Sequence, residues 1–167
     1  MSPRALPPAL LLLSPLLLPA EPAAAQSGDE PLLQESVDCP ESAAFVHVLT
    51  GMPLPQLMPD EEITPAVEEF HCSGENPYSG DEQAIAEGKG LYNPLCAGCH
   101  MPDGSGRMGP SLIDSTLKHE RVTTAHGEFE VIYGGAAGAM QPMGRRFTQD
   151  EILKIMAFVE TLGAPTE

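Results

Sequence analysis

Apolar residues recur with helical spacing near the C-terminal end of the chain. Between Thr148 and Gly163 they follow one another at intervals of three and four, which is the pattern of a helix with one buried face. Thr148 and Glu151 have the spacing of a capping box, and Gly163 and Pro165 mark the end of the helix. The predicted buried stripe consists of Ile152, Leu153, Ile155, Met156, Phe158, Val159 and Leu162.

A second amphipathic helix is predicted to begin after Asp81, which can cap it, and to close at Asn93-Pro94. Its apolar positions are Ala84, Ile85, Gly88, Leu91 and Tyr92. Thr64 and Pro65 are a good cap and first position for a short helix that ends at about Phe70 or His71. Two further short segments are predicted as helices or helical turns, Glu41–Leu49 and Phe129–Tyr133.

Segments rich in glycine and proline separate these helices. They are Met52–Pro59, Cys72–Gly80, Met101–Pro110 and Ala136–Arg146. Proline fixes φ and removes a backbone donor, so these segments are predicted to be loops. The last two are glycine-rich enough to wrap closely around another group. Because the regular elements are all predicted as helices, we expect an all-α fold.

The N-terminal residues 1–25 have the pattern of a secretory signal peptide. Arg4 precedes the apolar run Ala5–Leu18, and the small residues Ala23–Ala25 favour cleavage before Gln26. The apolar run is shorter than the roughly 20 residues of a membrane-spanning helix, so an uncleaved anchor is the weaker interpretation. Residues 26–80 are then an extension, part loop and part helix, ahead of a domain at residues 81–163.

The charge balance is strongly acidic, with 24 Asp and Glu against 8 Lys and Arg and a formal net charge of −16. Such a chain is repelled by nucleic-acid phosphates and by anionic membrane surfaces. The acidic residues first of all give a well-solvated surface. They also allow electrostatic steering toward a basic protein partner.

The four cysteines divide into two pairs. Cys96 and Cys99 stand in the sequence Cys-Ala-Gly-Cys-His, the spacing that attaches a c-type haem through two thioether bonds while His100 binds the iron. Cys39 and Cys72 do not supply a second zinc knuckle, and no βαβ pattern supports a thioredoxin-like site. In an exported protein, Cys39 and Cys72 are predicted to form a disulfide.

The chain resembles class I cytochrome c over residues 81–162. The resemblance is carried by Gly88-Lys-Gly-Leu-Tyr92, by Cys96–His100, by Met108-Gly-Pro-Ser-Leu112, and by a methionine loop before the last helix. It implies the class I fold around one covalent haem, with Gly88 letting the first haem-domain helix cross the last one closely, against Phe158. It also implies that the Pro110 carbonyl accepts a hydrogen bond from His100 Nδ1, which would orient the ligand.

The sixth iron ligand decides the chemistry of such a haem, because an open position permits small-ligand chemistry and a methionine favours electron transfer. Met140 fits the family pattern, since it precedes Gly144 by four residues and Thr148 by eight. Met143 is the alternative. His47, His71, His119 and His126 are possible ligands in principle, although each is more often a surface or structural histidine.

A narrower resemblance, from Val67 to Leu162, is to cytochrome c-L. It is carried by Phe70–Tyr78 and Ile132–Met140, and the Gly-Gly-Ala-x-Gly-x-Met loop that ends at Met140 is its specific part. Within that family, Cys39 and Cys72 make the chain most similar to a four-cysteine group of methanol-metabolism cytochromes. The chain departs from that family at 114–127, where Lys118-His-Glu-Arg121 replaces an aromatic-rich stretch. The resemblance implies a periplasmic one-electron carrier, not an enzyme.

In that family the electron donor is a PQQ-dependent methanol or alcohol dehydrogenase, and a downstream cytochrome or oxidase takes the electron. The rival interpretations are a haem sensor, a small peroxidase-like enzyme with a labile sixth ligand, and a fixed subunit of a larger complex. Arg107, Arg145 and Arg146 flank the two wrapping loops, where they are suited to haem propionates or the haem edge, or are isolated surface residues.

Overall fold

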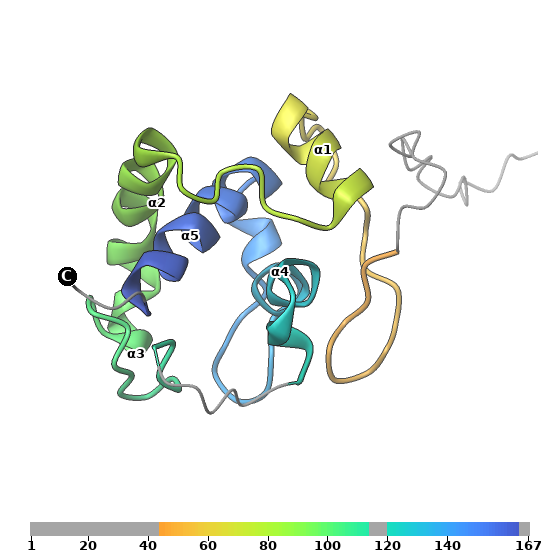
Figure 1. The fold of residues 1–167 in the computed structure, drawn as a ribbon. Helices are drawn as coiled ribbons and strands as arrows, with labels where there is room; N and C mark the ends of the chain where they lie inside the picture. The colour runs from red at the N-terminus through yellow and green to blue at the C-terminus, as the bar shows by residue number, and fades with distance from the viewer. Residues whose placement is uncertain (1–43, 114–119, 164–167) are drawn as a thin grey trace, which may run out of the picture. The chain divides into compact units, whose positions relative to one another are not determined.

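The computed structural model of the protein describes residues 44–113 and 120–163. Apart from one isolated bridge, the regular structure of these residues is helical, which confirms the predicted all-α class. In chain order the elements are α1 (Pro65–Ser73), α2 (Glu82–Leu95), α3 (Ala97–His100), the 3-10 turn η1 (Glu120–Thr123), α4 (Ala125–Gly134), the 3-10 turn η2 (Met143–Arg145) and α5 (Gln149–Leu162) (Figure 1). No helix within the described residues has the length and apolar character to cross a membrane.

Side-chain caps begin the helices where the sequence places them. Asp81 accepts a hydrogen bond of 2.8 Å from the Ala84 N–H at the start of α2. At the start of α5, Thr148 Oγ1 accepts from the Glu151 N–H at 3.2 Å, and Glu151 Oε2 accepts from the Thr148 N–H at 2.9 Å, which confirms the capping box. At the start of α1, Thr64 Oγ1 accepts a hydrogen bond of 3.3 Å from the Val67 N–H.

Three predicted helix boundaries are wrong. In each case a hydrogen bond, a cap or a glycine places the end of the helix elsewhere than the apolar pattern indicates. Helix α2 continues through Pro94 to Leu95, since the Cys96 N–H still reaches the Tyr92 carbonyl at 2.8 Å. Helix α4 begins at Ala125, four residues before the predicted start, because Thr124 caps it. Helix α1 runs on to Ser73, where Gly74 ends it with a φ of 72°.

The predicted helix at Glu41–Leu49 is also wrong for its described part. From residue 44 the chain is extended, turns between His47 and Gly51, and forms an antiparallel bridge between Val46 and Pro53. The extended form lets Phe45, only 1% exposed, insert between α1 and α4. The centroid of its ring lies 4.8 Å from that of Phe129 and 6.0 Å from that of Phe70.

The close crossing of α2 and α5 organises the other half of the core. A Cβ atom placed on Gly88 would lie 1.9 Å from the Lys154 carbonyl oxygen, so only glycine allows the two backbones to meet there. This confirms the predicted role of Gly88, but its contact is the Lys154 backbone rather than Phe158. Phe158 instead packs edge-on against Tyr92, with ring centroids 5.2 Å apart.

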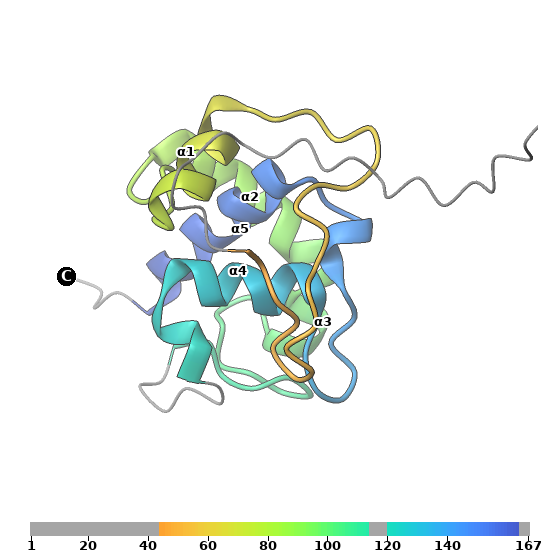
Figure 2. The same ribbon diagram turned by 90° about the vertical axis from the view of Figure 1, so that its right-hand side faces the viewer.

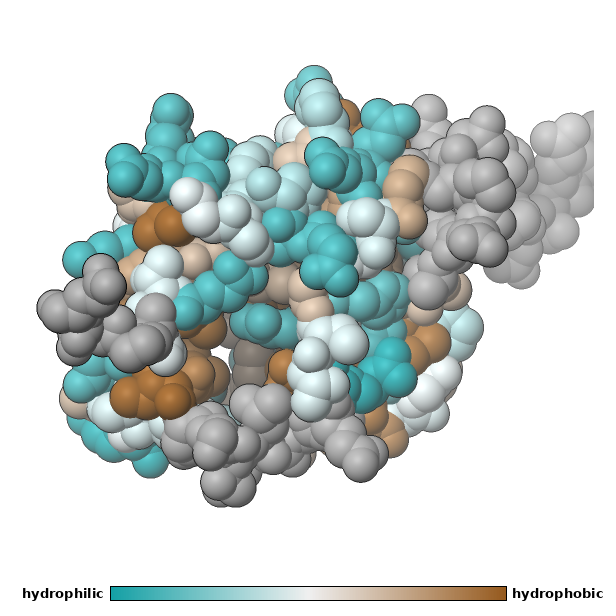
Figure 3. Space-filling view, viewed as in Figure 1, coloured by the Kyte–Doolittle hydropathy of each residue, from teal (hydrophilic) through white to brown (hydrophobic). Residues whose placement is uncertain are grey.

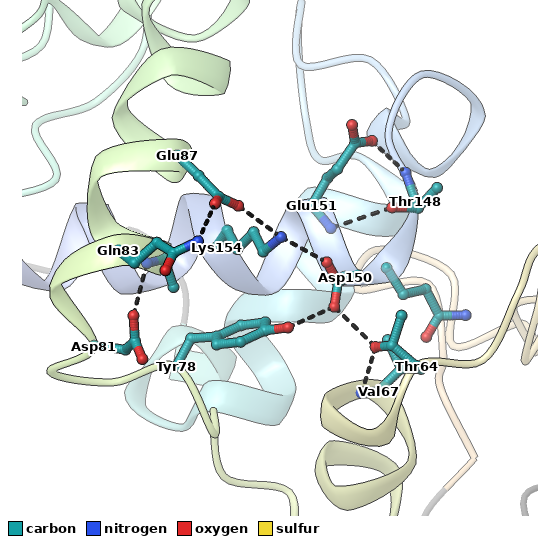
Figure 4. A network of polar contacts seen from close by, with 12 residues as sticks. Thr64, Val67, Tyr78, Asp81, Gln83, Glu87, Thr148, Asp150, Glu151 and Lys154 are labelled. Atoms are coloured by element: carbon teal, nitrogen blue, oxygen red, sulfur yellow. Dashed lines mark hydrogen bonds and ion pairs between the residues drawn. The ribbon is translucent and has the colours of Figure 1, made fainter.

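A polar network on the outer side of this crossing joins α1, α2 and α5 (Figure 4). Asp150 accepts hydrogen bonds from Tyr78 Oη at 2.7 Å and from Thr64 Oγ1 at 2.8 Å. Lys154 Nζ lies 3.0 Å from Asp150 and 2.8 Å from Glu87. The cap residue of α1 is thereby tied to the start of α5.

Candidate haem site

The end of α2 places the Cys-x-x-Cys-His motif. Cys96 is the last residue of α2's hydrogen-bonding pattern, and the four-residue helix α3 follows it directly to His100. Both Cys96 and Cys99 are half-buried free thiols. Burial, with a smaller contribution from Cys99, raises the pKa of Cys96 to about 11. The two thiols and the imidazole are therefore presented from one short helical turn.

The chain reverses direction immediately after His100. Met101 has a φ of 67°, a conformation that non-glycine residues rarely adopt. The Tyr92 hydroxyl donates a hydrogen bond of 2.8 Å to the Met101 carbonyl oxygen and so holds the reversal. This contact makes Tyr92, predicted as an apolar position of its helix, a positioning residue for the loop that follows.

The loop after α3 returns to cover one side of His100. His100 Nδ1 lies 2.9 Å from the Pro110 carbonyl oxygen, the contact that the resemblance implies. Because a carbonyl only accepts, Nδ1 carries the proton and Nε2 is left as a free lone pair. A Cβ atom at Gly109 would lie 2.7 Å from His100 Cε1, so glycine is needed where the loop passes the ring.

The methionine loop leaves α4 at Gly135, which has a φ of 80° and packs against the Met140 carbonyl and the Pro142 nitrogen. At its far end Gly144 lies against the Tyr133 ring, where an added Cβ would be 2.4 Å from Cε2. These two glycines fold the loop back over the end of α4. Met140 and Met143 both lie in it and are both half-buried, so burial does not distinguish them.

The described histidines other than His100 have partners of their own. His71 is buried, and its Nε2 lies 2.7 Å from Gln149 Oε1. His126 Nε2 lies 3.4 Å from Glu130 Oε1 on the same helix. His47 accepts a hydrogen bond from Leu49 within its own turn, and His119 lies outside the described residues.

A buried carboxylate, Glu130 of α4, is a feature that the sequence reasoning missed. It is fully buried and accepts hydrogen bonds from the Val46 N–H at 2.7 Å and from Arg121 Nε at 2.6 Å. It thus fastens both the N-terminal segment and the segment after the 114–119 stretch to α4. The only sequence signal was an acidic residue inside the apolar run Phe129–Tyr133.

The residues of the motif fit a covalent c-type haem. His100 offers a free Nε2, and the two thiols lie on the preceding turn. Figure 3 shows a hollow in this face of the molecule, between the α3 side and the α4 side, with hydrophobic side chains at its edge. The Tyr133 hydroxyl is buried and, among the described residues, has no hydrogen-bond partner. The donor set and the apolar surroundings are those that a haem requires.

Comparison with known proteins gives consistent matches. Residues 83–159 match the family described as cytochrome c oxidase, cbb3-type, subunit III. Cytochrome c-L of Methylorubrum extorquens is 38% identical over 99 residues, which are 59% of this chain and 50% of that protein. The cbb3-type cytochrome c oxidase subunit CcoP of Rubrivivax gelatinosus is 32% identical over 108 residues, which are 62% of this chain and 34% of that protein. The chain thus spans half or less of the curated relatives.

Two solved structures match over more of their length. Cytochrome CL of the marine methylotroph Methylophaga aminisulfidivorans MPT is 39% identical with a TM-score of 0.69, covering 71% of this chain and 80% of that one. Cytochrome cL of Hyphomicrobium denitrificans is 35% identical with a TM-score of 0.68, and the match covers 72% of this chain and 73% of that one. The fold and the motif are those of a class I c-type cytochrome. Within that class, the chain belongs to the cytochrome c-L family, and its cofactor is covalently bound haem c.

Proposed function

We propose that the protein is a periplasmic one-electron carrier with a single haem. Cys96 and Cys99 would hold the haem through thioether bonds, and His100 and Met140 would ligate its iron, with Met143 as the alternative. When bound, the haem supplies an iron that changes between the ferrous and ferric states. The contact between His100 Nδ1 and the Pro110 carbonyl carries the proposal, because it orients the imidazole and leaves Nε2 for the iron.

The chain's own residues favour electron transfer over catalysis. The loop that follows α3 passes closely against His100 at Gly109, and the loop that follows α4 packs against Tyr133 at Gly144, as expected for loops that enclose a fixed cofactor. A methionine in the second loop completes the ligand set and raises the reduction potential. Residues 81–163 form the proposed haem domain, and residues 26–80 are the proposed N-terminal extension.

The remaining parts of the proposal concern export and partners. Residues 1–25 act as a signal peptide, and Cys72 of α1 pairs with Cys39 in the oxidising periplasm. Cys39 lies outside the described residues. A PQQ-dependent methanol or alcohol dehydrogenase reduces the protein, and a downstream cytochrome or oxidase reoxidises it. The likeness to proteins named cytochrome c-L supports this choice of donor.

The ferric optical spectrum of the purified holoprotein tests the ligand assignment. We expect the weak band near the red end that reports an iron–sulfur bond. In Met140→Ala the band should disappear, and in the matched variant Met143→Ala it should remain. The reverse result would assign Met143. Absence of the band from the wild type would instead support a sensor or a peroxidase-like enzyme.

The donor is tested separately, by stopped-flow reduction with purified PQQ dehydrogenases that oxidise different alcohols. The proposal expects one of them to reduce the ferric protein rapidly and the others slowly. If the haem is six-coordinate with a methionine ligand and yet none of these dehydrogenases reduces it, the protein is an electron carrier for another donor.

A further inference from the structure

The segment that precedes α1 contacts the chain at both ends of the methionine loop, residues 135–147. In Figure 2 this segment, coloured orange to yellow, crosses α4 at the end where the loop begins. The loop then leads to Thr148, the cap of α5. A loop opens by backbone rotation at a few residues near its ends, so contacts at these places decide how easily it opens.

At the start of the loop, Leu54 packs on Gly134, the last residue of α4. A Cβ atom at Gly134 would lie 2.7 Å from Leu54 Cδ1, so the two are in close contact. Leu54 is itself held by a hydrogen bond of 2.9 Å from its N–H to the Phe45 carbonyl. The Ala136 N–H donates to the Met140 carbonyl at 3.3 Å. Met140 is therefore tied to the residues that follow directly on the backbone that Leu54 covers.

At the other end of the loop, Gln149 of α5 is inserted beside the turn that precedes α1. Its side chain is fully buried, and its Nε2 donates to the Gln56 carbonyl at 2.5 Å. Its backbone N–H donates to Glu61 Oε1, while Glu61 Oε2 accepts from the Met58 N–H at 3.0 Å. The Gln149 Oε1 atom lies 2.7 Å from His71 Nε2. One carboxylate, that of Glu61, thus joins the turn to the first residue of α5.

Tyr133 connects these two places. Its ring lies against Gly144 of the loop, where an added Cβ would overlap with it. Phe45 packs on the same ring, with the two centroids 6.4 Å apart. The Tyr133 hydroxyl is within electrostatic reach of Glu61, because the carboxylate adds to the rise that burial causes in the pKa of this hydroxyl. The second half of the loop therefore rests on a side chain that the N-terminal segment supports.

From these contacts we propose that residues 54–61 hold the methionine loop in place, and that Leu54 and Glu61 are positioning residues for the sixth iron ligand. The inference rests on the proposed electron carrier with a methionine ligand. It is the same for Met140 and for Met143, because both lie between the two braced ends. It gives the extension ahead of the haem domain a role in keeping the sixth position closed.

Imidazole binding to the ferric holoprotein measures how often the loop is open. Imidazole replaces the methionine sulfur on the iron only when the loop has moved away, so its apparent affinity is proportional to the population of the open loop. Glu61→Gln leaves one oxygen for two backbone N–H groups, so the closed loop loses a hydrogen bond to a charged group. Imidazole should then bind about tenfold more tightly than to the wild type.

Leu54→Ala tests the other end of the loop and leaves the groups around Glu61 in place. It should tighten imidazole binding by at least about threefold, since the cover on Gly134 is lost. Both variants should also lower the midpoint potential, because a methionine ligand that is held less firmly raises the potential less. Leu54→Ala decides the question even if Glu61→Gln does not fold.

The matched control is Glu130→Gln, the same replacement at another carboxylate that accepts from a backbone N–H of the N-terminal segment. Glu130 accepts from the Val46 N–H at 2.7 Å and pairs with Arg121 and His126, all of which lie outside the methionine loop. Guanidinium denaturation should show that this variant loses at least as much stability as Glu61→Gln. Its affinity for imidazole should nevertheless stay that of the wild type.

Two results would overturn the inference. One is wild-type imidazole affinity in folded Glu61→Gln and Leu54→Ala, which would show that the loop stays closed without these contacts. The other is equal tightening in Glu130→Gln, which would show that any loss of stability opens the loop. Failure of the proposed function looks different, since a wild-type protein without the iron–sulfur band has no methionine for imidazole to displace.

Discussion

Gly88 of α2 and Lys154 of α5 meet backbone to backbone. A Cβ atom at position 88 would lie 1.9 Å from the Lys154 carbonyl oxygen and 2.5 Å from its carbonyl carbon. The atoms in the way belong to a helix backbone, which cannot move aside as a flexible side chain can. The crossing of these two helices buries Tyr92 against Phe158 and so determines where the haem motif leaves α2.

The first prediction concerns this crossing. Gly88→Ala should lower the free energy of unfolding of the holoprotein by at least about 2 kcal/mol, because the helices must separate. Gly90→Ala is the matched control, since it lies in the same helix and a Cβ there meets no atom within 4 Å. It should raise stability by about 0.5–1 kcal/mol. Guanidinium denaturation measures both, and similar losses in the two variants would contradict the crossing.

The second prediction concerns the orientation of His100. Gly109→Ala places a methyl group against the imidazole and should push it away from the Pro110 carbonyl, destabilising the holoprotein by about 1–3 kcal/mol. A weaker hydrogen bond at Nδ1 makes the ligand less basic, so the midpoint potential should rise. Redox titration of the purified protein measures the shift.

The control for this variant is Gly98→Ala, because a Cβ at position 98 meets no protein atom within 4 Å. It lies inside the haem motif, so it tests whether any alanine near the haem has the same effect. A potential that moves equally in both variants would show that the Gly109 contact does not orient the histidine.

The third prediction concerns pH and the network around Asp150. Burial acts to raise the pKa of this carboxyl group, but hydrogen bonds from Tyr78, Thr64 and Lys154 outweigh it and hold the pKa below its ordinary value of 3.8. The unfolded chain therefore takes up this proton first as the pH falls. The stabilisation is fully present above about pH 4 and is lost as the pH falls through the folded-state pKa.

Asp150→Asn should accordingly cost about 1–2 kcal/mol at pH 7 and progressively less below pH 4. Denaturation curves of the variant and the wild type at pH 7, 5 and 3 measure the difference. Glu75→Gln, at an exposed position near the end of α1, should change stability little at any of these values. A constant cost from pH 7 to pH 3 would show that the carboxylate charge is not what stabilises the network.

Local signals in the sequence are sufficient to predict where a helix begins when a neighbouring residue caps it. The caps at Thr64, Asp81 and Thr148 were correctly predicted, because a cap is a hydrogen bond across three residues. The segment at 44–49 was predicted as a helix and is extended, because Phe45 gains more by packing between Phe70 and Phe129 than a short isolated helix gains by forming.

The sequence by itself determined the chemistry of the protein, since the Cys96–His100 spacing specifies a haem wherever the motif lies in the fold. Only the tertiary structure decided what surrounds it. Tyr92 donates a hydrogen bond to the Met101 carbonyl, and Glu130 joins Val46 to Arg121. These contacts span nine residues or more of the sequence, and no helical or strand periodicity encodes them.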